Sequence, residues 1–197
     1  MSLEFDAPAL PVSAGRAASS PWLNGWSTRQ YPADGLSISG RRIEIPVTAA
    51  SLDDSGAVSA AFLRQLEHRS SFEATVVTSP AGAMAGITAY TGQEHHFDLT
   101  VSGAGPGRRA TLRRRAADLT AERTVPLPGT GPVRLTVDCD GAEYRFTADG
   151  TAAGSGAARL LDAQWAPGFG SVRLGVFASG PQRGLVVFEG AGGEHAG

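Results

Sequence analysis

Residues 59–101 hold most of the side chains in this chain that could do chemistry together. The stretch reads SAAFLRQLEHRSSFEATVVTSPAGAMAGITAYTGQEHHFDLTV, and it contains three of the four histidines and the adjacent pair Arg64-Gln65. Imidazole, guanidinium and amide groups transfer protons, bind metal ions or form hydrogen bonds with the hydroxyls of a ligand. Three alternatives follow for this stretch: a catalytic centre, a ligand-binding surface, or the packed strands of a β-sandwich.

The histidines favour a polar cluster over a metal site. His95 and His96 are adjacent in an expected strand, so their side chains point to opposite faces of the sheet. His95 shares a face with Phe97 and is expected in the core, whereas His96 shares a face with Asp98. We expect His96 and Asp98 to form a polar cluster with His68 from a neighbouring strand. A metal site would need ligands that converge at about 2 Å on one ion, which this spacing does not favour.

Glycan hydrolysis would need two carboxyl groups that flank one bond, one of them with a raised pKa. The acidic residues that bear on this are scattered over polar strand faces: Glu67, Glu73, Asp98, Glu122, Asp138 and Glu143. No local spacing marks a pair among them, and charged residues are mostly solvated. We therefore assign no catalytic acid or base.

A sugar-binding surface uses aromatic rings against the apolar face of a sugar and polar side chains against its hydroxyls. Trp26 is the best candidate for an aromatic ring that stacks on a sugar, and the alternative is that Trp26 is buried in the core. Arg29, Arg64 and Gln65 are stronger candidates, because polar groups on the concave face of a sandwich must bond each other or meet a ligand. For Arg64, an internal ion pair is an equally good interpretation. The predicted ligand-binding residues are Trp26, Arg29, Arg64, Gln65, His68, Tyr90 and His96.

Short β-strands must position these side chains. Apolar and polar residues alternate with a period of two along most of the chain, as in residues 43–47, 72–76, 97–101, 133–137 and 172–176. About a dozen such segments at roughly ten-residue spacing predict an all-β fold, an antiparallel β-sandwich of two sheets packed face to face. Asp140-Gly141 is the strongest hairpin signal. Residues 108–123 fit either a short helix or two edge strands.

Length and composition fit one domain over residues 1–197. The 26 glycines and 12 prolines are typical of a turn-rich all-β chain. Residues 7–21 are expected to form a loop and residues 191–197 a flexible tail. Cys139 is the only cysteine, so neither a disulfide framework nor a cysteine metal cluster is expected, and we predict a small buried filler at a strand end.

The charge balance argues against nucleic acid and membranes as partners. There are 17 basic and 19 acidic residues, for a net charge of −2. The one basic cluster, RRATLRRRA at residues 108–116, is expected to be a solvated edge strand whose charge blocks association. No apolar run approaches the length of a membrane span. The N-terminus has no basic start followed by an apolar segment, so the expected location is the cytoplasm unless an export signal was removed.

The order of the motifs resembles the concanavalin A-like β-sandwich at the C-terminus of glycoside hydrolase family 43 β-xylosidases and arabinofuranosidases. The resemblance runs over residues 3–190 and is carried by WSTRQYP, LSISGRRIEIPVTAASL, the 59–101 stretch with its Arg-Gln pair and His68, PVRLTVDCDGAEYRFTADG and PGFGSVRLGVFASG. It implies a jelly-roll fold. In that family the catalytic part is a separate five-bladed β-propeller with three acidic residues, for which this chain has no room. The resemblance therefore implies an accessory role.

The preferred interpretation is a stand-alone accessory module, related to xylan- or arabinan-type glycans, that binds an oligosaccharide or a partner protein. Two alternatives stay open: a small glycan-active hydrolase whose carboxylate pair the spacing does not reveal, and a structural domain that assembles with a partner chain. No cofactor is expected. A structural calcium ion is an open alternative, and Asp6 is the first residue to consider as its ligand.

Overall fold

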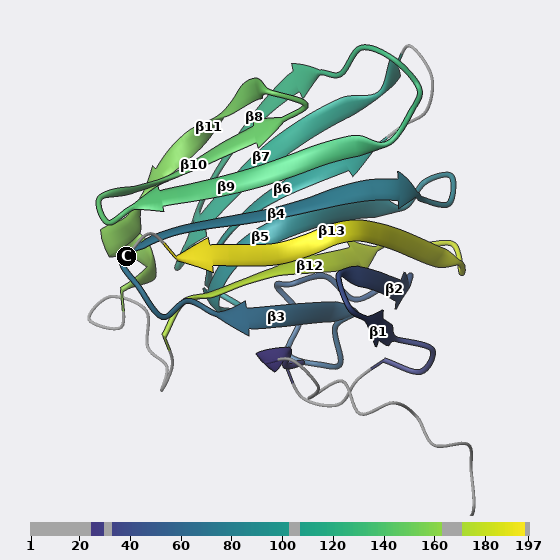
Figure 1. Ribbon diagram of the computed structural model, residues 1–197, viewed down its shortest axis with the longest axis horizontal. Helices are drawn as coiled ribbons and strands as arrows, with labels where there is room; N and C mark the ends of the chain where they lie inside the picture. The colour runs from purple at the N-terminus through teal and green to yellow at the C-terminus, as the bar shows by residue number, and fades with distance from the viewer. Residues whose placement is uncertain (1–24, 30–32, 103–106, 163–170, 196–197) are drawn as a thin grey trace, which may run out of the picture.

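The period-two alternation produces two antiparallel sheets that pack face to face (Figure 1). The structure is a computed structural model, and it describes residues 25–29, 33–102, 107–162 and 171–195. All strand pairings within the two sheets are antiparallel. The predicted all-β, antiparallel β-sandwich is therefore confirmed.

The first sheet has seven strands, in the order β1 (Ser37–Ser39), β2 (Arg42–Pro46), β13 (Leu185–His195), β4 (Arg69–Thr78), β9 (Val133–Asp140), β10 (Glu143–Ala148) and β11 (Thr151–Ala157). The second sheet has six strands, in the order β3 (Ala60–Arg64), β12 (Arg173–Ser179), β5 (Met84–Gly92), β6 (His95–Ser102), β7 (Arg109–Ala116) and β8 (Leu119–Pro126). One 3₁₀ turn, η3 (Ala158–Leu161), follows β11.

The main core lies between the sheets. In β4, Phe72, Ala74 and Val76 are buried, while the residues between them are partly exposed. Ile87 of β5 and Leu99 of β6 are fully buried members of the same core. Each fully buried side chain of this size contributes about 1.5–3 kcal/mol relative to an exposed one. The alternation of apolar and polar residues thus orients each strand, because its apolar face is buried between the two sheets.

The Asp140-Gly141 hairpin forms as predicted, between β9 and β10. Gly141 has a positive φ of 93°, which suits glycine. The Asp140 carboxylate accepts hydrogen bonds from the backbone N–H groups of Ala142, at 2.9 Å, and Glu143, at 3.0 Å. These two bonds, with the one from Arg145, lower the pKa of Asp140 to about 2. The hairpin closes one end of the sandwich.

Of the two alternatives for residues 108–123, the structure has strands, β7 and β8, and no helix. The expected edge position is wrong for residues 108–116, because β7 lies between β6 and β8 and only β8 is at the sheet edge. The expected flexible tail is ordered as far as residue 195, because its backbone continues β13 and pairs with β4, for example Gly193 with Phe72. The predicted loop at 7–21 lies outside the described residues. Within the described ranges, no helix is long and apolar enough to cross a membrane.

A second, smaller apolar cluster covers the outer face of the six-stranded sheet. Residues 47–59, between β2 and β3, fold over this face, and their buried members pack on side chains of β3, β5 and β12. The cluster comprises Leu52, Val58, Ala60, Phe62, Tyr90 and Phe177. Glycine is required beneath it, since a Cβ atom on Gly175 would lie 2.3 Å from the backbone oxygen of Ala61 and 2.8 Å from Cδ1 of Phe62. This layer forms the floor for the polar residues described below.

Substitution of this glycine tests the close packing of Phe62 on the sheet. Gly175→Ala is expected to lower the free energy of unfolding by about 1–3 kcal/mol, because the added methyl group must displace backbone and ring atoms. Chemical denaturation measures the change. Gly131→Ala is the control, since a Cβ atom there meets nothing within 4 Å. Equal midpoints for Gly175→Ala and the control would contradict this packing.

Candidate functional site

The residues predicted to bind a ligand lie in three different parts of the structure. Trp26 lies in the main core, and the prediction of a sugar platform is wrong for it. Its side chain is only 4% exposed, and its ring meets Phe72 edge-on with centroids 6.2 Å apart. The segment that carries Trp26 bridges to β3 through Ser27 and Phe62, which turns the indole inward.

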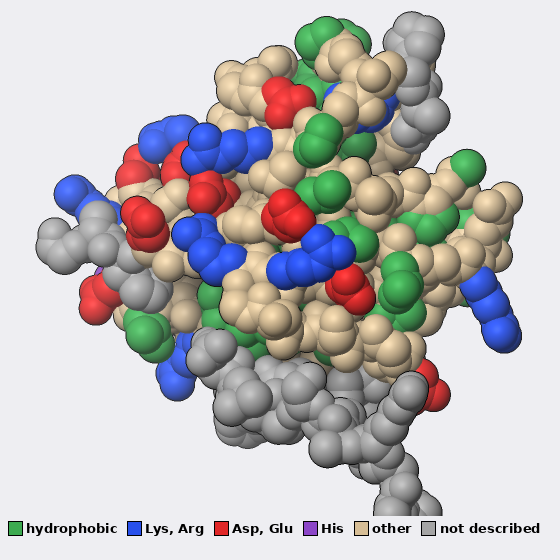
Figure 2. All heavy atoms as spheres, turned by 45° about the vertical axis from the view of Figure 1, so that its right-hand side comes forward, with side chains coloured by type: hydrophobic (Ala, Val, Ile, Leu, Met, Phe, Trp, Pro, Cys, Tyr) green, Lys and Arg blue, Asp and Glu red, His purple; other side chains and the backbone are tan. Residues whose placement is uncertain are grey.

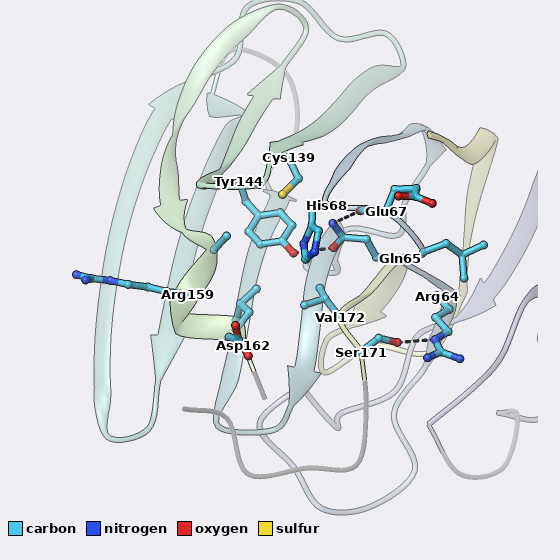
Figure 3. Close-up of a pocket in the computed structure, with 14 residues that line it drawn as sticks. Arg64, Gln65, Glu67, His68, Cys139, Tyr144, Arg159, Asp162, Ser171 and Val172 are labelled. Carbon is cyan, nitrogen blue, oxygen red and sulfur yellow. Dashed lines mark hydrogen bonds between the residues drawn. The ribbon is translucent and has the colours of Figure 1, made fainter. Parts of the chain in front are cut away.

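Arg64, Gln65 and His68 do come together, at one end of the sandwich. They line a cavity of about 490 Å³ at the junction of β3, β4, the β9–β10 hairpin, η3 and the start of β12 (Figure 3). His68 lies in the turn between β3 and β4, not on a strand, and therefore cannot join His96 as predicted. Cys139 is buried at the end of β9 and lines the same cavity, which confirms its predicted position.

The polar groups of this end cavity are held in place by hydrogen bonds. The hydroxyl of Tyr144 donates to Oε1 of Gln65 at 2.6 Å, and Nε2 of Gln65 donates to the backbone oxygen of Glu67 at 2.9 Å. Burial raises the pKa of Tyr144, so this hydroxyl stays a donor. Nε of Arg64 donates to Oγ of Ser171 at 2.7 Å, so the predicted alternative of an internal ion pair is not what is observed.

His96 lies on the outer face of the six-stranded sheet, within a buried network of charges. Its side chain is fully buried; Nδ1 lies 2.7 Å from Oδ2 of Asp98 and Nε2 lies 2.9 Å from Oδ1 of Asp53. The other oxygen of Asp98 accepts a hydrogen bond from Thr88 at 2.7 Å. Arg113 joins the two carboxylates, at 2.6 Å from Asp53 and 3.1 Å from Asp98. The predicted His96–Asp98 cluster is thus present, with Asp53 and Arg113 in the place expected for His68.

Asp53 was not among the predicted residues, yet it links the 47–59 loop to the sheet. Burial by itself raises the pKa of Asp53, but hydrogen bonds from Arg113 and Arg115 outweigh it and lower the pKa to about 2. Asp53 is therefore charged at neutral pH. Arg113 and Arg115 were predicted to lie on a solvated strand, and instead they are partly buried against this carboxylate.

Arg29 and Tyr90 lie beside this network, and the predicted ligand-binding residue Tyr90 is buried, so its ring is not open to a ligand. Tyr90 is 1% exposed, and its ring lies between those of Phe62, at 5.2 Å, and His96, at 5.9 Å. The guanidinium groups of Arg29 and Arg173 lie 6.0 and 5.5 Å from the centroid of this ring. Arg29 and Arg173 line a second cavity, of about 370 Å³.

The carboxyl groups with large shifts in pKa do not suit general acid catalysis. In Asp53 and Asp140 the pKa is lowered to about 2, whereas a catalytic acid needs a raised pKa.

Among the described residues, no group of three or more His, Cys, Asp or Glu side chains is arranged to hold a metal ion. Asp6, named above as the first residue to consider as a calcium ligand, lies outside the described residues. What both cavities offer is hydrogen-bonding groups fixed in position.

Removal of the Asp53 charge tests whether the network stabilises the fold. Asp53→Asn is expected to cost about 1–3 kcal/mol at pH 7, because Arg113 and Arg115 lose a charged acceptor. The folded pKa of Asp53 is lowered from its ordinary value of 3.8 to about 2, so its contribution is present above pH 3.8 and is lost as the pH falls towards 2. Denaturation of wild type and variant between pH 7 and pH 2 should show the difference shrinking in acid. The exposed Asp34→Asn serves as control, and a difference that is independent of pH would contradict this role.

Comparison with solved structures shows where this fold occurs. The xylan β-1,4-xylosidase from Bacillus halodurans superposes with a TM-score of 0.74 and 18% identity, over 93% of this chain and 40% of that chain. The protein titled "Xyloglucan PUL GH43B" of Bacteroides ovatus gives a TM-score of 0.71 and 20% identity, over 84% of this chain and 35% of that chain. A functionally unknown protein from Saccharomyces cerevisiae gives a TM-score of 0.62 and 12% identity, over 87% of this chain and 95% of that chain.

These likenesses show the fold, and they also show that the chain spans only 35–40% of the two glycosidase-type structures. No curated protein sequence matches the chain significantly. The family model described as the β-xylosidase C-terminal concanavalin A-like domain matches residues 19–189, which is most of the chain. The same domain class was expected from the ordered motifs of the sequence, and the two-sheet topology agrees with it. The chain therefore belongs to the family of β-xylosidase C-terminal concanavalin A-like domains.

Proposed function

We propose that this domain is an accessory module that binds an oligosaccharide of the xylan or arabinan type in the end cavity, and that it is not itself the hydrolase. Its family is named for β-xylosidases, and one structural neighbour is named a xylan β-1,4-xylosidase. The observation that carries the proposal is the set of fixed polar side chains from Arg64, Gln65 and Ser171 around a cavity of about 490 Å³. That volume is within the range of small-ligand sites, about 300–1,000 Å³.

The geometry suits recognition of hydroxyl groups. Gln65 is held by Tyr144 and Arg64 is held by Ser171, so neither side chain loses much rotational freedom when a ligand binds. The guanidinium group of Arg64 has further N–H groups besides Nε–H that can donate to a ligand oxygen. His68 is exposed and lines the same cavity. Figure 3 shows Gln65, His68 and Tyr144 near one another, with Arg64 and Ser171 towards the other side.

The ring of Tyr144 is 2% exposed, so binding in this cavity depends on hydrogen bonds rather than on stacking of a sugar on that ring. We therefore expect weak binding that depends on individual polar side chains. This property fits a module that works beside another binding or catalytic site, where effective concentration compensates for low affinity.

The hydrolase alternative has less support. The two carboxyl groups with the most lowered pKa values are both engaged by arginine, Asp53 by Arg113 and Asp140 by Arg145. A structural role beside a catalytic part fits the chain's coverage of 35–40% of the glycosidase-type structures. Binding of a sugar by the isolated domain separates the accessory module from a purely structural domain.

Titration with neutral xylo- and arabino-oligosaccharides, followed by calorimetry or by NMR, tests this proposal. The wild-type domain should bind at least one of them. Arg64→Ala and Gln65→Ala should each raise the Kd about tenfold, the effect of losing one good hydrogen bond to a ligand. Arg42→Ala, on the outer face of the other sheet, should leave the Kd unchanged.

The melting temperature of each variant is measured in parallel, because loss of Gln65 leaves the Tyr144 hydroxyl without its acceptor. No binding of any of these sugars to the folded wild-type domain, at millimolar concentration, would refute the proposal. Binding that survives in both variants would refute the assignment to the end cavity.

A further inference from the structure

One row of side chains crosses the outer face of the six-stranded sheet at a single register. Residues paired directly across neighbouring strands point to the same face. The row runs from β3 to β7 and consists of Arg64, Arg173, Tyr90, His96 and Arg115. At one end Arg115 is paired with Asp53, whereas at the other end two arginines are direct neighbours. The row therefore combines a neutralised half with a half rich in positive charge.

Arg173 is the central residue of that positive half. Its guanidinium group lies 5.2 Å from the ring of Phe62 and 5.5 Å from the ring of Tyr90, and no hydrogen bond or ion pair joins it to a described residue. Burial lowers the pKa of Arg173, and the nearby charge of Arg29 lowers it further. Like charges placed directly opposite each other, as Arg173 and Arg64 are, destabilise a sheet.

Arg29 approaches the same ring from the segment before β1. Its guanidinium group lies 6.0 Å from the centroid of Tyr90. The acceptors that it meets are neutral: Oε1 of Gln93 at 2.7 Å and the backbone oxygen of Asp54. Neither Arg29 nor Arg173 forms an ion pair with a carboxylate of the described residues.

The outer face of the seven-stranded sheet differs in this respect. Four arginines there are paired with carboxylates: Arg41 and Arg134 with Glu73, Arg42 with Glu44 and Glu189, and Arg145 with Asp140. Figure 2 shows acidic and basic side chains interleaved on the visible face. Other described arginines also lack an ion pair, and what distinguishes Arg29 and Arg173 is that both lie against the ring of Tyr90 and line one cavity.

The two arginines line a cavity of about 370 Å³, large enough for one sugar ring. Gln93 and Glu94 line it as well, and Glu94 is exposed. Two guanidinium groups against one carboxylate leave one excess positive charge in the lining. A guanidinium group stacked on aromatic rings keeps its N–H edge available, and that edge matches both oxygens of a carboxylate.

We propose that the cavity between Arg29 and Arg173 binds the carboxylate of a uronic acid residue, so that the module recognises acidic glycans. The sugar identity of the ligand rests on the function proposed above, whereas the anionic group is assigned from the two arginines alone. Arg173 and Arg29 hold the carboxylate, and Gln93 is placed to bond a neighbouring hydroxyl. The Tyr90 ring supports both guanidinium groups from below and does not itself contact the sugar.

Paired ligands test the proposal on the whole chain. In the first pair, free glucuronic acid is compared with glucose. In the second pair, a xylo-oligosaccharide that carries one glucuronic acid is compared with the unsubstituted oligosaccharide of the same length. The acidic member of each pair should bind about tenfold more tightly at low ionic strength, and added salt should reduce this preference. Arg173→Gln and Arg29→Gln should each abolish it, and Arg173→Lys should retain only part of it.

Arg145→Gln is the matched control, because it removes an arginine from the other sheet and should leave the preference intact. Equal binding of acidic and neutral sugars, or a preference that survives in Arg173→Gln, would overturn the proposal. The proposal would also be overturned if inorganic phosphate competed for the site as strongly as glucuronic acid does, because the site would then select any anion. If the protein prefers acidic sugars through Arg173 but binds no neutral oligosaccharide, this site is supported and the proposed binding of neutral glycans is refuted. If the protein binds neutral oligosaccharides through Gln65 but shows no preference for acidic sugars, the proposed function is supported and this site is refuted.

Discussion

The carboxylate of Asp53 connects the loop at residues 47–59 to the outer face of the six-stranded sheet. It meets a buried imidazole and two guanidinium groups, those of His96, Arg113 and Arg115. The Nε2 atom of this imidazole also lies 3.1 Å from the backbone oxygen of Gln93, so Asp53 adds a charged partner to a nitrogen that is already bonded. Closure of the loop therefore brings a carboxylate to the polar groups of the sheet and covers the apolar cluster around Phe62 in a single arrangement.

The same arrangement defines the second cavity. Because the loop is fixed at Asp53, the backbone oxygen of Asp54 meets Arg29, and Arg29 in turn is held against Tyr90. Removal of the network would thus loosen one wall of the arginine cavity. The end cavity is independent of it, since Gln65 and Arg64 are held by Tyr144 and Ser171 from other elements. The two cavities therefore have separate supports, which matches the proposal of one site for hydroxyl groups and another for an anion.

Much of the fold follows from local patterns, and less of the site does. The alternation in β4 and the turn at Asp140-Gly141 are local signals, and both are realised in the structure. A flexible tail was expected beyond residue 190 because its glycines carry no burial pattern, whereas the structure pairs this segment with β4 and buries Ala191 in the core. For Trp26, residue type alone does not distinguish a binding ring from a core ring, and contact with Phe72 decides it.

The sequence by itself determined the all-β class, the family and the face on which His96 and Asp98 lie, because each depends on the period of two or on motifs along the chain. Only the tertiary structure decided which side chains meet. Asp53 and Arg113 are 60 positions apart, and Arg29 and Gln93 are 64 apart. Such contacts depend on strand order, on register and on how a loop crosses a sheet. These are fixed by the simultaneous burial of many side chains, and no segment read alone contains that information.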